Sequence, residues 1–184
     1  MNLASSNSLE KSPRYTSPAI FLHWMVAILI IGMIGLGWYM MSIEDEPDSG
    51  WLFQLHKSIG LLIVALVLLR LVWRFTHRPP ALPQQVPEWQ KKASEALHWL
   101  LYAAMAVMLM VGIAGALSSK HDLVFFGLPL PRLLAQNHDL SEIFFSIHSV
   151  CAWVLVVLIS LHFLAALKHL IVNKDGLFQR MWFS

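Results

Sequence analysis

The sequence predicts an all-α protein, an integral membrane four-helix bundle, and two observations carry this prediction. First, 57% of the 184 residues are hydrophobic and only 13% are charged, whereas soluble domains contain roughly 25% charged residues. Second, four apolar stretches reach the length of roughly 20 residues that a helix needs to cross a hydrocarbon core. Because lipid cannot satisfy backbone polar groups, such stretches favour helices.

The four predicted helices span about residues 19–41, 53–75, 96–117 and 143–172, and together they form one domain, residues 19–172. Residues 1–18 are predicted to form a polar N-terminal tail. They lack the order of a cleaved signal peptide, in which a charged region precedes an apolar one. Residues 173–184 predict a C-terminal tail. The loop from His77 to Gln90 contains four prolines, which predicts an extended connection without a core of its own.

Basic residues are distributed unevenly between the two sides of the predicted bundle, and they set its orientation. Short cytoplasmic loops of membrane proteins carry an excess of Lys and Arg. Of the 13 such residues, the outer side has only Lys57, Lys120 and Arg132. The side of the termini has Lys11, Arg14, Arg70, Arg74, Arg78, Lys91, Lys92, Lys168, Lys174 and Arg180. Both termini are therefore predicted to be cytoplasmic, and the net charge of +2 does not indicate a nucleic-acid partner.

Four histidines lie in the predicted helices at depths that match in pairs. His148 and His162 are 14 residues apart, a spacing that places them on nearly one helix face and roughly 21 Å apart along the axis. His56 lies near the outer end of the second helix, and His23 lies near the inner end of the first. The sequence therefore predicts an outer pair, His56 with His148, and an inner pair, His23 with His162.

Two imidazoles that face each other inside a helical bundle are a ligand set for haem iron, so the pairs predict two haems b. The alternative is four hydrogen-bonded interior histidines, but ionisable groups inside a membrane are costly and usually functional. Structural zinc is less suitable because it requires four clustered ligands. The glycines of the first three helices fit either space for a porphyrin or close helix packing, and both interpretations remain open.

The motifs around these histidines resemble those of the bacterial cytochrome b561 family, four-helix di-haem cytochromes of the inner membrane. The resemblance covers nearly the whole chain beyond the N-terminal tail. The matching pieces are the His148–His162 spacing, Leu22-His23-Trp24, His56-Lys57-Ser58-Ile59-Gly60, Leu69-Arg70-Leu71, Trp73-Arg74, Phe126-Gly127-Leu128 and Lys174-Asp175.

The resemblance implies that residues 19–172 are a transmembrane cytochrome b domain, with His23, His56, His148 and His162 as axial ligands of the haem irons. It also implies a quinone-linked oxidoreductase that transfers electrons between a periplasmic donor and the quinone pool. One branch of the family oxidises superoxide at the periplasmic face and reduces ubiquinone. Superoxide is therefore the candidate donor and ubiquinone the expected acceptor.

His169 is the candidate quinone contact, because the family places a quinone-contacting histidine at this position, seven residues after the last predicted ligand. The alternative is a histidine that stabilises the C-terminus of its helix. His98, at the start of the third predicted helix, is interpreted as interfacial, with a contact to quinone or a haem propionate as the weaker alternative.

Four basic residues lie at the depths of the predicted haems. Arg14, Arg70 and Arg74 lie near the inner haem, and Lys57 adjoins the outer ligand. They are candidates for contacts with haem propionates or other anions, because arginine matches the geometry of a carboxylate. Charge that only sets the membrane orientation explains them equally well.

The first outer loop is acidic and bears on what donates electrons. Superoxide is an anion, and a basic outer surface would attract it. Glu44, Asp45, Glu46 and Asp48 depart from that expectation and would suit a basic protein partner, although Lys57, Lys120 and Arg132 remain as a local positive group. The alternative function is therefore a haem-b relay subunit that docks a separate periplasmic redox protein, dehydrogenase or hydrogenase.

Overall fold

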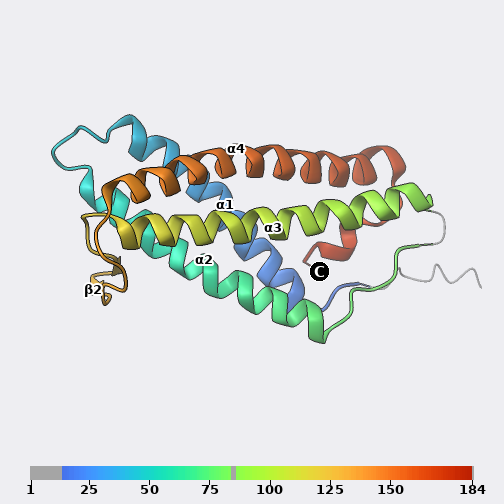
Figure 1. Ribbon diagram of the computed structural model, residues 1–184. Helices are drawn as coiled ribbons and strands as arrows, with labels where there is room; N and C mark the ends of the chain where they lie inside the picture. The colour runs from blue at the N-terminus through green and yellow to red at the C-terminus, as the bar shows by residue number, and fades with distance from the viewer. Residues whose placement is uncertain (1–13, 84–85, 184) are drawn as a thin grey trace, which may run out of the picture.

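Four long helices make up most of the computed structural model, which describes residues 14–83 and 86–183. They are α1 (Ser17–Ser42), α2 (Gly50–Thr76), α3 (Glu88–Ser118) and α4 (His138–Lys168), and successive helices run in opposite directions (Figure 1). All four are long and apolar enough to cross a membrane. The predicted all-α membrane bundle is confirmed. Residues 1–13 of the predicted N-terminal tail lie outside the described residues.

The helices extend past the apolar stretches from which they were predicted. Helix α3 begins at Glu88 instead of residue 96, and α4 begins at His138 instead of residue 143. Both additional segments are polar and stabilised locally. Lys91 pairs with Glu88 at 2.7 Å, and the Asn137 side chain caps α4 by accepting a hydrogen bond from the Leu140 amide at 2.9 Å. An apolar stretch marks only the part of a helix that lies in lipid. Polar helical turns that continue into water are therefore not predicted from hydropathy.

The two ends of the bundle are called inner and outer here, following the orientation predicted from the basic residues. The start of α1, the end of α2, the start of α3 and the end of α4 meet at the inner end (Figure 1). The outer end carries the α1–α2 loop and the longer α3–α4 connection. Which end faces the cytoplasm stays a prediction.

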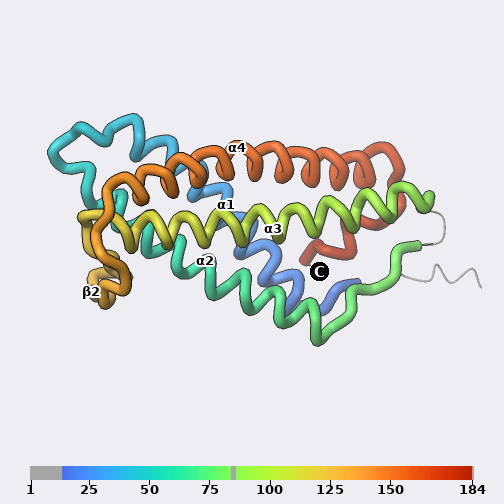
Figure 2. Tube along the Cα trace, in the orientation of Figure 1, coloured from blue at the N-terminus to red at the C-terminus, as the bar shows by residue number. Residues whose placement is uncertain are grey.

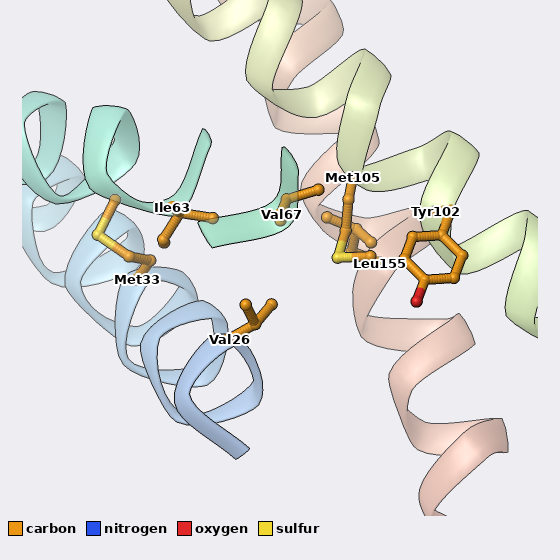
Figure 3. Packing of buried hydrophobic residues seen from close by; sticks show 7 residues of the cluster. All are labelled: Val26, Met33, Ile63, Val67, Tyr102, Met105 and Leu155. Atoms are coloured by element: carbon orange, nitrogen blue, oxygen red, sulfur yellow. The ribbon is translucent and has the colours of Figure 1, made fainter. Parts of the chain in front are cut away.

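A buried apolar cluster occupies the middle of the bundle and draws on all four helices (Figure 3). Leu155 of α4 lies seven residues from both His148 and His162, so the cluster separates the two histidine pairs. Large apolar side chains on the outside, such as Phe75 at 69% exposure, suit contact with lipid. The cluster consists of Val26, Met33, Ile63, Val67, Tyr102, Met105 and Leu155.

A short hairpin in the α3–α4 connection packs against the outer end of α2. Its strands are β1 (Val124–Phe125) and β2 (Leu128–Pro129), and the turn residues Phe126 and Gly127 have φ of 46° and 89°, as a two-residue hairpin turn requires. The buried Ser58 hydroxyl accepts a hydrogen bond from the Phe126 amide at 3.0 Å and lies 3.1 Å from the Val124 carbonyl oxygen. These bonds hold the hairpin two residues from His56.

The chain beyond α4 turns back toward the bundle (Figure 2). A π-helical turn, η1 (His169–Asn173), follows α4 directly, and a 3-10 turn, η2 (Phe178–Met181), comes after it. Between them, Lys174 and Gly176 adopt left-handed φ values of 51° and 77°. Residues predicted as a C-terminal tail therefore pack on the inner end of the bundle.

Candidate haem sites

The outer histidine pair comes together as the sequence predicts. His56 of α2 and His148 of α4 have ring centroids 6.1 Å apart, with an interplanar angle of 71°. The Nδ1 atom of His148 lies 3.1 Å from the Met108 carbonyl oxygen, which assigns the proton to Nδ1 and leaves Nε2 for a metal. The Nδ1 atom of His56 is buried and has no hydrogen-bond partner among the described residues.

Glycines bring α1 and α3 close to these two rings. A Cβ atom on Gly112 would lie 2.9 Å from Cε1 and Nδ1 of His148, and one on Gly37 would lie 3.5 Å from Cε1 of His56. Gly32 and Gly35 have no such neighbours within 4 Å. The glycines therefore do not share one role. Gly112 is required by the close approach of His148, whereas Gly32 and Gly35 border open space.

The inner pair has the same spacing, and a third histidine joins it. His23 of α1 and His162 of α4 have ring centroids 6.1 Å apart, at an interplanar angle of 68°. The ring of His98, from α3, lies 5.2 Å from that of His162. Nδ1 of His98 bonds to the Ser94 carbonyl at 2.6 Å. The sequence analysis interpreted His98 as interfacial, with a contact to quinone or a haem propionate as the weaker alternative, and it did not identify the contact with His162. Its position one helical turn before the core residue Tyr102 was the available signal.

Arginines gather beside the inner histidines around a tyrosine that sequence reasoning did not identify. Arg70 donates from Nε to the Tyr102 hydroxyl at 3.0 Å, while its Nη1 atom is buried without a partner among the described residues. The guanidinium groups of Arg70 and Arg74 lie 5.9 and 5.6 Å from the centroid of the Tyr102 ring. A pocket lined by both arginines, Tyr102 and Tyr15 opens here. A buried guanidinium with an unused donor suits a carboxylate ligand.

The two other candidate cations, Arg14 and Lys57, make different contacts. Arg14 donates a hydrogen bond to the Trp182 carbonyl oxygen, so it holds the chain's C-terminal end. Lys57 is half-buried at the outer end, where its ammonium group interacts electrostatically with the carboxylate of Asp122.

His169 is bonded to an acidic residue just beyond α4. Its Nδ1 atom lies 2.6 Å from Oδ2 of Asp175, and the Leu177 amide donates to Oδ1 of the same carboxylate at 3.1 Å. Burial alone would raise the pKa of Asp175, but the hydrogen bonds from His169, Leu177 and Asn173 together lower it. The carboxylate is therefore ionised at neutral pH, and it leaves Nε2 of His169 as the nitrogen available to a ligand.

Comparison with known proteins places this geometry in a family. Residues 14–184 match the family model of prokaryotic cytochrome b561. The chain belongs to that family. It is accordingly a multi-pass bacterial membrane protein of the haem b electron-transfer type.

Three relatives align over most of their own length. The chain is 34% identical over 176 residues to cytochrome b561 homolog 2 of Escherichia coli (strain K12), covering 91% of this chain and 90% of that protein. It is 29% identical over 172 residues to a probable superoxide oxidase, CybB, of Yersinia pestis, covering 91% and 95%. Cytochrome b561 homolog 1 of Escherichia coli (strain K12) is 28% identical over 174 residues, covering 91% and 96%.

The residues present fit the haem b that this family implies. Among the described residues, the outer end offers a buried imidazole nitrogen without a partner, on His56. It lies opposite the His148 ring, whose Nδ1 atom is bonded to the Met108 carbonyl and leaves Nε2 for a metal. The inner end offers an unused guanidinium donor on Arg70 beside a second histidine pair. Imidazole nitrogens for iron and cations for propionates are the groups that bind haem in helical proteins.

Proposed function

We propose that the protein holds two haems b, one at each histidine pair, and transfers electrons across the bacterial inner membrane from a periplasmic donor to the quinone pool. The observation that carries this proposal is the equal spacing of 6.1 Å between ring centroids in both pairs. Two imidazoles that bind one metal from opposite sides, each with a bond of about 2.0 Å, have ring centroids about 6 Å apart. Both pairs have this spacing, at opposite ends of one bundle.

In this proposal His56 and His148 are the outer axial ligands, and His23 and His162 are the inner ones. Bound haem b supplies a one-electron carrier, and the protein sets its potential through ligands, charge and burial. Arg70 and Arg74 would hold the propionates of an inner haem, and their positive charge would favour its reduced state. Lys57 is the corresponding anion contact at the outer end.

We further propose that both termini are cytoplasmic and that residues 19–172 form the transmembrane cytochrome b domain. Ten of the 13 lysines and arginines then face the cytoplasm. Of the two pairs, the inner one is then the pair that delivers electrons to quinone.

His169 is the proposed quinone contact, with ubiquinone as the acceptor. Its Nδ1 atom is taken by Asp175, which fixes the ring and presents Nε2 as the nitrogen that bonds a quinone oxygen. The residue lies seven positions beyond His162 on the same chain segment. This places it at the same end as the inner pair.

Superoxide is the first candidate donor, and the likeness to the probable superoxide oxidase of Yersinia pestis supports it. The positive charge of the outer cations is partly neutralised. Arg132 forms an ion pair with Asp122 at 2.7 Å, and the negative charge of Asp122 also interacts with Lys57. Together with the acidic α1–α2 loop, this pairing favours a second candidate, a relay that accepts electrons from a basic periplasmic redox protein.

The experiment that tests the donor is stopped-flow mixing of the oxidised protein with superoxide, with and without ubiquinone. We expect the haem absorbance to show that superoxide reduces the haems after mixing. Reoxidation of the haems should follow only when ubiquinone is present. Superoxide dismutase added beforehand is the control and should abolish the signal. Absence of haem reduction by superoxide would exclude it as the donor and favour the relay.

A further inference from the structure

The C-terminal segment, residues 174–183, is a defined structure that reverses the chain direction after α4. The reversal is made by the left-handed backbone conformations of Lys174 and Gly176. Asp175 stabilises it by accepting from the Leu177 amide and by pairing with His169. Left-handed residues of this kind commonly terminate helices and redirect the chain. The segment then crosses the inner end of the bundle (Figure 1).

A buried arginine connects this segment to the α2–α3 loop and to Tyr15, which lies just before α1. Arg180 is only 3% exposed, and its Nη2 atom donates to the carbonyl oxygens of Pro80 and Ala81 at 2.7 and 3.0 Å. Its guanidinium also lies 5.8 Å from the centroid of the Tyr15 ring. The Tyr15 amide donates in turn to the Arg180 carbonyl at 3.3 Å. Hydrogen bonds to a charged group are among the stronger ones, so the contact is firmly held.

The same segment holds the first turns of α1 through a tryptophan. Trp24 donates from its indole nitrogen to the Met181 carbonyl at 2.7 Å, and its ring meets that of Trp182 edge-on, with 5.4 Å between centroids. The next residue back along the chain is His23, whose ring lies 5.4 Å from the Trp24 ring. A continuous set of contacts therefore runs from the C-terminal segment to a proposed haem ligand.

The two histidine pairs differ in how their rings are oriented. At the outer pair, the Met108 carbonyl holds the His148 ring directly. At the inner pair, neither His23 nor His162 has a hydrogen bond to any residue in the ranges 14–83 and 86–183. The direction of His23 must therefore come from its backbone and its neighbours, and Trp24 is the adjacent side chain with a fixed hydrogen bond.

We propose that the C-terminal segment is a clasp that orients His23 through the Trp24–Met181 bond, which makes Trp24 a positioning residue for the inner haem. The proposal rests on the proposed function, because it takes His23 as an axial ligand. Groups that orient a metal ligand typically change metal affinity or activity by about 10- to 100-fold when they are removed. The clasp serves the inner site, because among residues 14–83 and 86–183 its side-chain hydrogen bonds and ring contacts do not reach His56 or His148.

The test is Trp24→Phe in the full-length, haem-loaded protein, because phenylalanine keeps an aromatic ring and removes the indole N–H. We expect the low-spin electron paramagnetic resonance signal of the inner haem to shift and its midpoint potential to change. Transfer of the inner haem to apomyoglobin should become about tenfold faster. The outer haem should keep its signal and its transfer rate. Repeating the change in a His148→Ala background isolates the inner signal.

Trp38→Phe is the matched control, because Trp38 also belongs to α1 but pairs with Trp153, at 5.2 Å between centroids, and is 48% exposed. It should leave both haems unchanged. Arg180→Gln is a second variant that loosens the clasp far from His23, and it should reproduce the effect of Trp24→Phe in weaker form.

An unchanged inner signal and transfer rate in both clasp variants would overturn the proposal, and so would equal loss of both haems. Failure of the proposed function gives a different result, because the unmodified protein would then lack two low-spin haems before any substitution is made.

Discussion

Replacing His148 with alanine should remove the outer haem and leave the inner haem in place. The His148 imidazole is the ring that lies opposite His56, at 6.1 Å between ring centroids, and alanine cannot bind iron. The apolar cluster around Leu155 separates the two pairs, so the inner ligands should keep their geometry. Haem content per chain should fall by half, and the remaining haem should stay low-spin, as measured by the pyridine haemochrome assay and paramagnetic resonance.

The matched control is His138→Ala, which alters an exposed histidine at the start of the same helix. It should retain the full haem content. His23→Ala should give the mirror result, with loss of the inner haem alone. Equal loss of both haems from His148→Ala would contradict the assignment of the histidines to two independent sites.

Replacing Gly112 with alanine should weaken the outer haem site although Gly112 binds nothing itself. The added methyl carbon would lie 2.9 Å from two atoms of the His148 ring, closer than carbon atoms pack. The ring would have to move away from α3 and lose its bond to the Met108 carbonyl. Because that bond orients a proposed ligand, the affinity for the outer haem should fall by about 10-fold or more. Haem transfer to apomyoglobin measures this loss.

Gly50→Ala is the control for the general effect of adding a methyl group to a helical glycine. Gly50 begins α2, is exposed and has no neighbour within 4 Å of an added Cβ. Alanine is a better helix former than glycine by up to about 1 kcal/mol, so this change should leave haem binding intact and slightly raise thermal stability. If Gly112→Ala behaved like Gly50→Ala, the close packing of α3 on His148 would have no role in the site.

The bundle and both histidine pairs could be predicted because each depends on a local pattern. Apolar stretches of sufficient length predict membrane helices directly. The 14-residue spacing between His148 and His162 follows from helix geometry alone, and alternating helix direction then supplies His56 and His23 as partners. Such predictions need no knowledge of side-chain contacts.

The remaining features depend on contacts between distant parts of the chain. Tyr102 receives the hydrogen bond of Arg70 from a helix 32 residues away, and Trp24 bonds to Met181 across 157 residues. Nothing in the local sequence of a short polar-aromatic tail indicates that it folds back. His98 was found in the sequence but placed in the interface, because its contact with His162 depends on how α3 packs against α4.

The most direct test of the two-site account is the number and spin state of the haems in the purified, full-length protein. The pyridine haemochrome assay against protein concentration gives the number of haems, and paramagnetic resonance gives their ligation. Two haems b per chain, both low-spin with bis-histidine spectra, are the predicted result. One haem per chain, or high-spin iron in both sites, would contradict the pairing of His56 with His148 and of His23 with His162.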